Sequence, residues 1–172
     1  TNYSRSIKKK FLNKRGIIFD LDGVLIDSLE NMKTSWNLTN KKFNLNISFN
    51  KYYNCIGKPF KEILKKIKIE KKKFNLVEKE YNSKSYKNFN KIRFYSNVRT
   101  VLRYLKKKKY FLGVLTSKDK FRTKKILKRL NIKFDIIQCH EKNYRGKPYP
   151  DIIKKIIKNK KLKINECVYI GD

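Results

Sequence analysis

The chain has 172 residues, which is long enough for one hydrophobic core with a small inserted lobe. Its 46 Lys and Arg against 14 Asp and Glu give a formal net charge of +32. The basic residues are mostly lysines spread along the whole chain, which predicts a solvated surface that attracts anions and argues against a dedicated nucleic-acid-binding face. No apolar run approaches the ~20 residues of a membrane span, and three cysteines without paired spacing (Cys55, Cys139, Cys167) predict a cytoplasmic protein.

The first predicted elements are a basic N-terminal extension over residues 1–15, without the apolar core of a signal peptide, and a buried strand over 17–20. The strand ends on Asp20 and Asp22, and Gly23 allows a sharp turn directly after them. Two like charges placed together cost free energy unless a cation or a shared proton offsets them. The pair therefore favours a divalent metal with a nucleophile beside it, and a surface turn is the alternative.

The next region, residues 29–90, is predicted to be helical, with an irregular link over 52–60. Apolar residues recur at helical spacing in three stretches. These are Leu29, Met32, Trp36 and Phe43, then Ile63, Leu64 and Ile67, and finally residues 74–89. Trp36 is expected in the core of this region.

Strands and helices alternate over the rest of the chain. Strands are predicted over 110–115, 134–139 and 168–170, and Asp119 is predicted to cap a helix. The helices are marked by Val98, Val101, Leu102 and Leu105, by Phe121, Ile126, Leu127 and Leu130, and by Ile152, Ile153, Ile156 and Ile157. This alternation predicts an α/β fold with a Rossmann-like parallel sheet, in which ligands bind beyond the carboxyl ends of the strands.

Several chemically useful side chains follow the predicted strand ends. Asp20 and Asp22 follow the first strand, Thr116 and Ser117 the second, and Asp172 the fourth. The loop after the third strand carries Lys147, which Gly146, Pro148 and Pro150 hold in a stiff segment. Taken singly, the hydroxyls could cap a helix, the lysine could be a surface residue and Asp172 could lie in a turn. Together they predict one catalytic crevice.

The sequence resembles the haloacid dehalogenase-like phosphohydrolases over about residues 16–172. Residues 20–28 (DLDGVLIDS) match the first motif of the family, 115–117 (LTS) the second, 147–151 (KPYPD) the third and 169–172 (YIGD) the start of the fourth. Within the family, the sequence resembles the members with a helical cap, such as phosphoglycolate phosphatase and β-phosphoglucomutase. The resemblance implies a core over 16–28 and 91–172 and a small inserted helical cap over 29–90.

The resemblance also implies roles for the matching residues. Asp20 is the expected nucleophile, which forms an aspartyl-phosphate, and Asp22 the general acid and base. Thr116, the backbone N–H of Ser117, and Lys147 are expected to hold the phosphate. Mg²⁺ is the implied cofactor, with Asp20, the backbone carbonyl of Asp22 and Asp172 as ligands.

Two positions depart from the family pattern or lie in its variable part. Asn97 stands where a Pro-Gly turn is common, and we expect it to adopt the left-handed conformation. Lys58 lies in the stretch 55–60, where the substrate-contact loop of the cap is expected, and is a candidate specificity residue. The chain ends at Asp172, before a further acid of the fourth motif, so we expect an incomplete C-terminus of the core.

The predicted function is a Mg²⁺-dependent phosphatase acting on a small phosphorylated metabolite, such as a sugar phosphate or phosphoglycolate. A sugar-phosphate mutase like β-phosphoglucomutase is the enzymatic alternative. An inactive fragment or a basic module that binds anions or nucleic acid is the alternative of another class. The sequence predicts no oligomeric state.

Overall fold

The computed structural model describes residues 13–141, 144–147 and 149–171. Its centre is a parallel four-stranded sheet of β1 (Gly16–Phe19), β4 (Phe111–Thr116), β5 (Ile136–Cys139) and β6 (Cys167–Ile170), in the order β5-β4-β1-β6. The central strand β1 pairs with β4 on one side and β6 on the other. The predicted α/β fold with a parallel sheet is confirmed.

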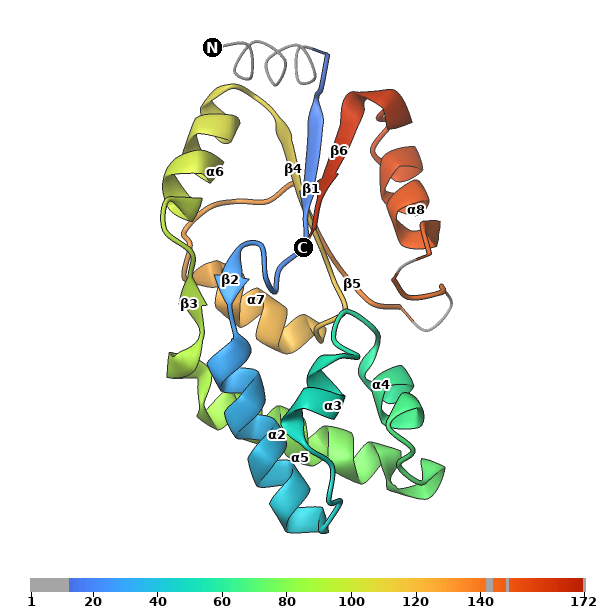
Figure 1. Ribbon diagram of the computed structural model, residues 1–172. Helices are drawn as coiled ribbons and strands as arrows, with labels where there is room; N and C mark the ends of the chain where they lie inside the picture. Colours follow the sequence, from blue (N-terminus) through green and yellow to red (C-terminus); the bar gives the residue numbers. More distant parts are fainter. Residues whose placement is uncertain (1–12, 142–143, 148, 172) are drawn as a thin grey trace, which may run out of the picture.

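Helices cover both faces of this sheet (Figure 1). Ile17 and Phe19 of β1 lie in one apolar cluster with residues of α6 (Val98–Lys107) and α7 (Lys120–Lys128). Ile18 lies in a second cluster with residues of α8 (Asp151–Asn159). Successive side chains of a strand point to opposite faces, so β1, which is buried on both faces, has a continuous apolar run in place of an alternating pattern.

The residues 29–91, called here the helical insertion, form a separate group of helices between two short strands. They comprise α2 (Leu29–Phe43), α3 (Phe49–Tyr53), α4 (Phe60–Lys66) and α5 (Phe74–Lys87), with 3-10 turns at Lys71–Lys73 and Phe89–Lys91. The insertion has its own apolar cluster, in which Trp36 is fully buried, as predicted. The Trp36 ring stacks on Tyr52 with 4.4 Å between the centroids.

A two-stranded antiparallel sheet joins the insertion to the rest of the molecule. Its strands, β2 (Ile26–Asp27) and β3 (Arg93–Phe94), pair Ile26 with Phe94 and Asp27 with Arg93. The sequence did not predict these strands, because two residues are too few to show a strand period. The end of α3 extends by two residues into the link expected to be irregular over 52–60, and the 3-10 turn at Ile164–Glu166 was not predicted.

Two local predictions about helix starts are confirmed. Asp119 caps α7, since its Oδ1 accepts a hydrogen bond of 2.9 Å from the backbone N–H of Arg122. Asn97, which precedes α6, has a left-handed backbone with φ of 65°. Asn97 and Asp119 therefore mark the points at which α6 and α7 begin.

Three apolar residues predicted on buried helix faces are exposed instead. Phe121 is 66% exposed and its ring lies tilted against that of Tyr86 in the insertion, while Val101 and Leu29 are 48% and 45% exposed. Each helix is covered only along the narrow stripe that faces its packing partner, so residues beside the stripe remain in solvent. In the part of the chain that the structure describes, no helix is both long and apolar enough to cross a bilayer.

The carboxyl ends of the strands point toward the helical insertion (Figure 1). The chain moves from β1 to β4 and β5 on one side, then returns to place β6 on the other side of β1. Such a reversal leaves a crevice beyond the end of the central strand, which is where open α/β sheets bind ligands.

Candidate active site

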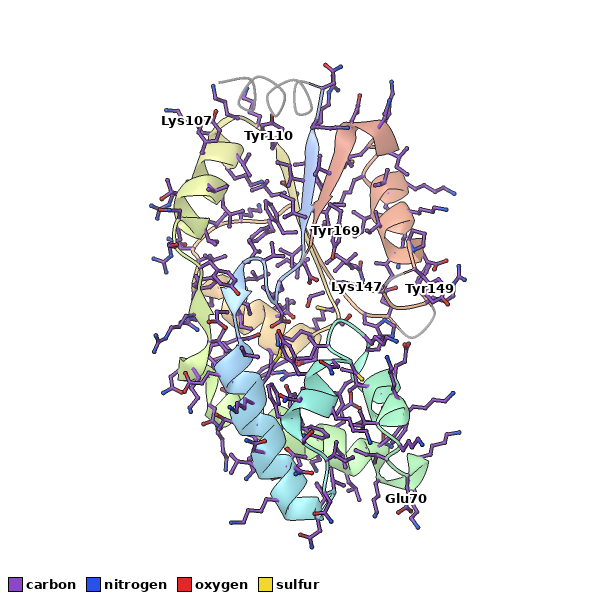
Figure 2. The ribbon with its side chains drawn as sticks, in the orientation of Figure 1. Glu70, Lys107, Tyr110, Lys147, Tyr149 and Tyr169 are labelled. Atoms are coloured by element: carbon purple, nitrogen blue, oxygen red, sulfur yellow. The ribbon has the colours of Figure 1, made fainter. Side chains whose placement is uncertain are left out.

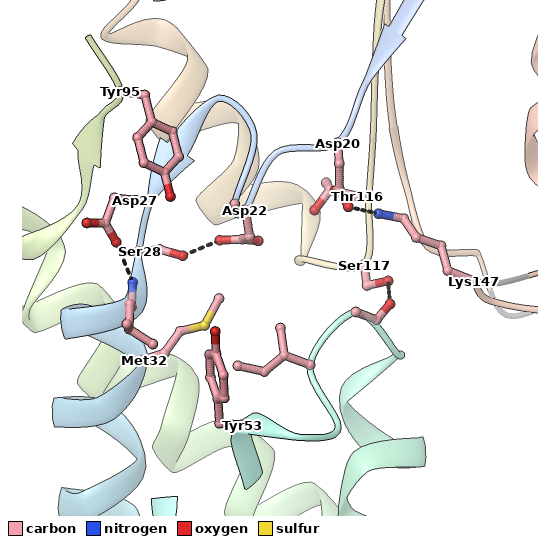
Figure 3. Close-up of a pocket in the computed structure, with 14 residues that line it drawn as sticks. Asp20, Asp22, Asp27, Ser28, Met32, Tyr53, Tyr95, Thr116, Ser117 and Lys147 are labelled. Carbon is pink, nitrogen blue, oxygen red and sulfur yellow. Dashed lines mark hydrogen bonds and ion pairs between the residues drawn. The ribbon is translucent and has the colours of Figure 1, made fainter. Parts of the chain in front are cut away.

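A cavity of about 410 Å³ lies at this crevice, between the sheet and the insertion (Figure 3). The core contributes Asp20, Asp22, Thr116, Ser117 and Lys147 to its wall. The insertion contributes less polar residues, including Met32, Tyr53 and Ile56. The cavity therefore brings together five of the seven residues that the sequence singled out, with polar groups on one side and an apolar wall opposite.

Asp20 follows β1 directly and is 8% exposed. Both of its carboxylate oxygens have partners: Oδ1 accepts a 2.7 Å hydrogen bond from the N–H of Leu21, and Oδ2 lies 2.5 Å from Lys147 Nζ. Burial raises the pKa of Asp20 above its ordinary value, although the charge and hydrogen bond of Lys147 oppose the rise. The carboxylate is thus oriented, and Lys147 favours its ionised form.

Asp22 lies in the tight turn that follows. Gly23 has φ of 79°, a backbone that side chains rarely tolerate, and its N–H donates to Ile26 O at 3.0 Å. Asp22 Oδ1 accepts a 2.5 Å hydrogen bond from Ser28 Oγ and lies 3.1 Å from Lys118 Nζ. The turn places the second carboxylate across the cavity from Lys147, as Figure 3 shows.

Thr116 and Ser117 lie at the end of β4. Thr116 is buried, and its Oγ1 accepts a 3.1 Å hydrogen bond from the N–H of Lys118. Ser117 Oγ donates to the carbonyl oxygen of Gly57 at 2.7 Å, so this hydroxyl joins the core to the insertion. The predicted pair therefore borders the cavity together with Asp20, ahead of the start of α7.

Lys147 reaches the cavity from the loop between β5 and α8. Figure 2 contrasts it with Lys107, which points away from the molecule at the far end of α6. Besides its pair with Asp20, its Nζ lies 5.8 Å from the ring centroid of Tyr169 on β6. At the neighbouring Gly146, a Cβ atom would lie 2.5 Å from Pro59 Cγ, so a glycine is required where the insertion approaches.

The remaining predicted residues lie elsewhere. Lys58 borders a smaller cavity beside the main one. Asp172, like Pro148 and residues 1–12 of the predicted extension, lies outside the described residues. No cluster of three His, Cys, Asp or Glu side chains suited to a metal occurs within the described ranges.

The donors that are described nevertheless suit a hard cation. Asp20 is a buried carboxylate with a raised pKa, and a carbonyl and a second carboxylate belong to Asp22 two residues later. Oxygen donors of this kind are those that Mg²⁺ prefers. Asp20 and Asp22 therefore fit the predicted metal, with further oxygen ligands to come from outside this pair.

Sequence reasoning missed three residues at or beside the site. Ser28 and Lys118 both hold Asp22, and Arg122 is buried in the first turn of α7, where it borders the smaller cavity. Ser28 belongs to the first motif, but the resemblance to the family implies no role for it. Nothing in composition distinguishes Lys118 or Arg122 from the other basic residues, because their burial depends on the packing of the insertion against α7.

Chemically, the arrangement presents a fixed carboxylate beside an ammonium group, with hydroxyls and a second carboxylate around the same space. Such a set can bind an anionic group and attack it. The sequence model of one protein family, the haloacid dehalogenase-like hydrolases, matches residues 17–172 of this chain. The chain belongs to this family.

Individual relatives of this family agree with that assignment. The pyrophosphatase PpaX of Oceanobacillus iheyensis is 26% identical over 162 residues, which cover 92% of this chain and 74% of that protein. A haloacid dehalogenase-like hydrolase of Bacteroides fragilis has a TM-score of 0.83 at 23% identity, covering 92% of this chain and 79% of that one. A predicted phosphoglycolate phosphatase of Haemophilus somnus 129pt has a TM-score of 0.81 at 24% identity, covering 93% and 77%. These structures share the fold of this hydrolase.

Proposed function

We propose that this hydrolase is a Mg²⁺-dependent phosphatase that cleaves a small phosphorylated metabolite through an aspartyl-phosphate on Asp20. The pairing of the buried Asp20 with Lys147, at the carboxyl end of β1 and open to the main cavity, carries the proposal. A carboxylate held ionised by an ammonium group is suited to attack an electrophile, and the same ammonium favours an anionic substrate.

In the first step, an Asp20 oxygen attacks phosphorus while the bond from phosphorus to the leaving oxygen breaks. Asp22 gives its proton to the leaving oxygen, so the alcohol departs neutral and Asp22 becomes a carboxylate. Lys147 and the hydroxyl of Thr116 hold the phosphoryl oxygens during the transfer. The 2.5 Å bond from Ser28 and the contact with Lys118 keep the Asp22 carboxyl in place.

In the second step, water attacks the phosphorus of the aspartyl-phosphate. The Asp22 carboxylate takes the proton from this water, and the bond between phosphorus and the Asp20 oxygen breaks. Inorganic phosphate leaves, Asp20 is restored as a carboxylate and Asp22 regains its proton. The two carboxylates thus complete a cycle with no net change.

Mg²⁺ would be held by Asp20, the carbonyl of Asp22 and Asp172, and when bound it offsets the repulsion between the anionic nucleophile and the anionic substrate. Asp20 and Asp22, the two of these residues that the structure describes, support the proposal with their oxygen donors at the wall of the main cavity. We place the enzyme in the cytoplasm, in keeping with the free state of its three cysteines.

We further propose that residues 16–28 and 91–172 act as the catalytic core and residues 29–90 as a cap. The main cavity has walls from both parts, and Ser117 and Gly146 of the core contact the stretch 55–60 of the insertion. A cap of this kind excludes water and contacts the leaving group. The names of the pyrophosphatase and phosphoglycolate phosphatase relatives favour a small, highly anionic substrate.

A phosphate-release screen tests the proposed activity. With Mg²⁺, the full chain is expected to hydrolyse at least one member of a panel of sugar phosphates, 2-phosphoglycolate and pyrophosphate. Asp20→Asn should lower turnover at least about a thousandfold, whereas Glu62→Gln, which removes an exposed carboxylate from α4, should retain it. Conversion of β-glucose 1-phosphate to glucose 6-phosphate in the presence of a bisphosphate primer would instead identify a mutase.

A further inference from the structure

A second cavity of about 60 Å³ lies between α7 and the insertion, next to the main one. Asp22, Gly57 and Ser117 border both cavities. Three basic side chains also border the second cavity, namely Lys58, Lys118 and Arg122. In a site built for an uncharged group, this gathering of cations would be unfavourable.

Arg122 is the most unusual of the three. It is 7% exposed, its Nε is paired with the Asp119 carboxylate, and its guanidinium carbon lies 5.6 Å from the ring centroid of Tyr81. Its Nη1 is buried and has no hydrogen-bond partner among the described residues. A buried donor without a partner costs free energy, and charged groups cost more than neutral ones. Because Arg122 also borders the second cavity, an anion bound there would supply an acceptor close to this guanidinium.

Lys118 and Lys58 add charge to the same space. The Lys118 side chain is 5% exposed and lies 3.1 Å from Asp22 Oδ1, while Lys58 lies half-buried on the loop before α4. Even with Asp22 and Asp119 counted, the basic groups around this cavity outnumber the carboxylates. The local field therefore favours an anion over a neutral group.

The position of Asp22 decides which part of a substrate could reach the second cavity. Asp22 is proposed to protonate the leaving oxygen, and its side of the main cavity is the side shared with the second one. A group that extends past Asp22 therefore belongs to the leaving group and not to the transferred phosphoryl. The space exceeds what one water needs and accommodates a small charged head.

We infer that Arg122, Lys118 and Lys58 form a second anion subsite, which binds a carboxylate or a second phosphate on the leaving group of the substrate. The inference rests on the proposed function for the assignment of the leaving-group side. It names the substrate class: a compact phosphate ester or anhydride with an additional anionic group a few bonds from the scissile oxygen. It also gives Lys58, which the sequence singled out for specificity, a definite ligand.

Calorimetric binding in the Asp20→Asn variant of the full chain tests this subsite without turnover. Three probes are compared: 2-phosphoglycolate, pyrophosphate, and 2-hydroxyethyl phosphate, which replaces the carboxylate of the first by a hydroxymethyl group. An anionic tail should tighten binding about tenfold or more, as expected for hydrogen bonds to charged groups. Comparison of the first two probes separates a carboxylate from a phosphate preference.

Arg122→Gln and Lys58→Met, each added to Asp20→Asn, should reduce the preference for an anionic tail to within about threefold. Lys58 lies on a loop, so its variant keeps the test valid if Arg122→Gln unfolds. Lys128→Met, which removes an exposed lysine from the same helix as Arg122, should leave the preference unchanged. Equal affinity for the charged and neutral tails before these substitutions, or a preference that survives both of them, would overturn the subsite. Hydrolysis is measured separately, so binding without turnover would count against the phosphatase and not against the subsite.

Discussion

The charge of Asp20 is subject to opposing effects, which link the activity of the site to the stability of the fold. Burial disfavours its charge, whereas Lys147 and the N–H of Leu21 favour it, and the pKa remains raised overall. A carboxyl whose pKa is higher in the folded state binds its proton more tightly there. Its ionisation therefore removes stability as the pH rises from the unfolded value through the folded one. The native enzyme is thus destabilised at neutral pH by the residue proposed as its nucleophile.

This linkage predicts that Asp20→Asn stabilises the protein in a pH-dependent way. The unfolding temperature of the variant should exceed that of the wild type at neutral pH, and the difference should shrink near the ordinary pKa of 3.8. Thermal unfolding followed by circular dichroism at both pH values measures it. A difference that does not change with pH would contradict the account.

Asp135 provides a control, because its pKa is shifted in the opposite direction to that of Asp20. Burial opposes its charge, but a 2.7 Å hydrogen bond from the N–H of Leu112 and the ion pair with Lys106 outweigh burial and lower its pKa. A lowered pKa contributes stability above the unfolded value, which is lost as the pH falls. Asp135→Asn should therefore lower the unfolding temperature at neutral pH and change it little in acid.

At the level of single residues, the sequence was informative where a residue type was unusual for its place. Two carboxylates at the end of an apolar strand, and a lysine between a glycine and a proline, can be recognised from the sequence alone. Lys118 and Arg122 gave no such signal, since they are two basic residues among many in a lysine-rich chain. Their burial comes from packing between segments far apart in the sequence.

Among the elements, the close approach of the loop before α8 to the insertion is the most sensitive contact. A Cβ at Gly146 would lie 2.5 Å from Cγ and 2.7 Å from Cδ of Pro59, which is closer than real contacts allow. Gly146→Ala should cost about 1–3 kcal/mol in unfolding free energy. It should also lower turnover, because Lys147 is the next residue in the chain.

The clash with Pro59 can be tested by a double-mutant cycle. Pro59→Ala removes the ring atoms that Gly146→Ala would meet, so the double variant should recover most of the lost stability and turnover. Denaturant unfolding and the phosphatase assay provide the two readouts. Strictly additive losses would mean that this contact does not set the distance between the loop and the insertion.

The insertion depends on its own core. Trp36 is fully buried, stacks on Tyr52, and donates from Nε1 to Ile47 O at 3.0 Å. Trp36→Ala should cost about 3–5 kcal/mol. Leu38→Ala, on the exposed side of the same helix, should stay within about 0.5 kcal/mol. Equal losses for the two variants in denaturant unfolding would show that Trp36 does not support this core.

The elements that the sequence predicted are those in which apolar residues recur at a regular spacing over the whole element. The parallel strands, α2 and the helices after residue 97 have enough apolar repeats to be recognised, and the bounds of the strands differ from expectation by one or two residues. The strands β2 and β3 are too short to carry a period, and the exposure of Phe121 depends on a contact with Tyr86 that local sequence does not encode.

For the molecule as a whole, the charge of +32 has two consequences. Like charges repel within the folded state, and the same field concentrates anions near the protein. Raising the ionic strength from 0.01 to 0.1 M shortens the screening length from about 30 to about 10 Å. The unfolding temperature should therefore rise with salt, while kcat/KM for an anionic substrate should fall. A salt-independent kcat/KM would show that the global field does not assist substrate capture.

The central claim is that Asp20 carries the phosphoryl group during turnover. The most direct measurement is an acid quench during steady-state hydrolysis of an accepted substrate, followed by mass spectrometry of the peptides. The peptide that contains Asp20 should gain the mass of one phosphoryl group, with the modification assigned to Asp20 and absent from Asp20→Asn. An unmodified Asp20 during active turnover, together with full activity of Asp20→Asn, would contradict the account.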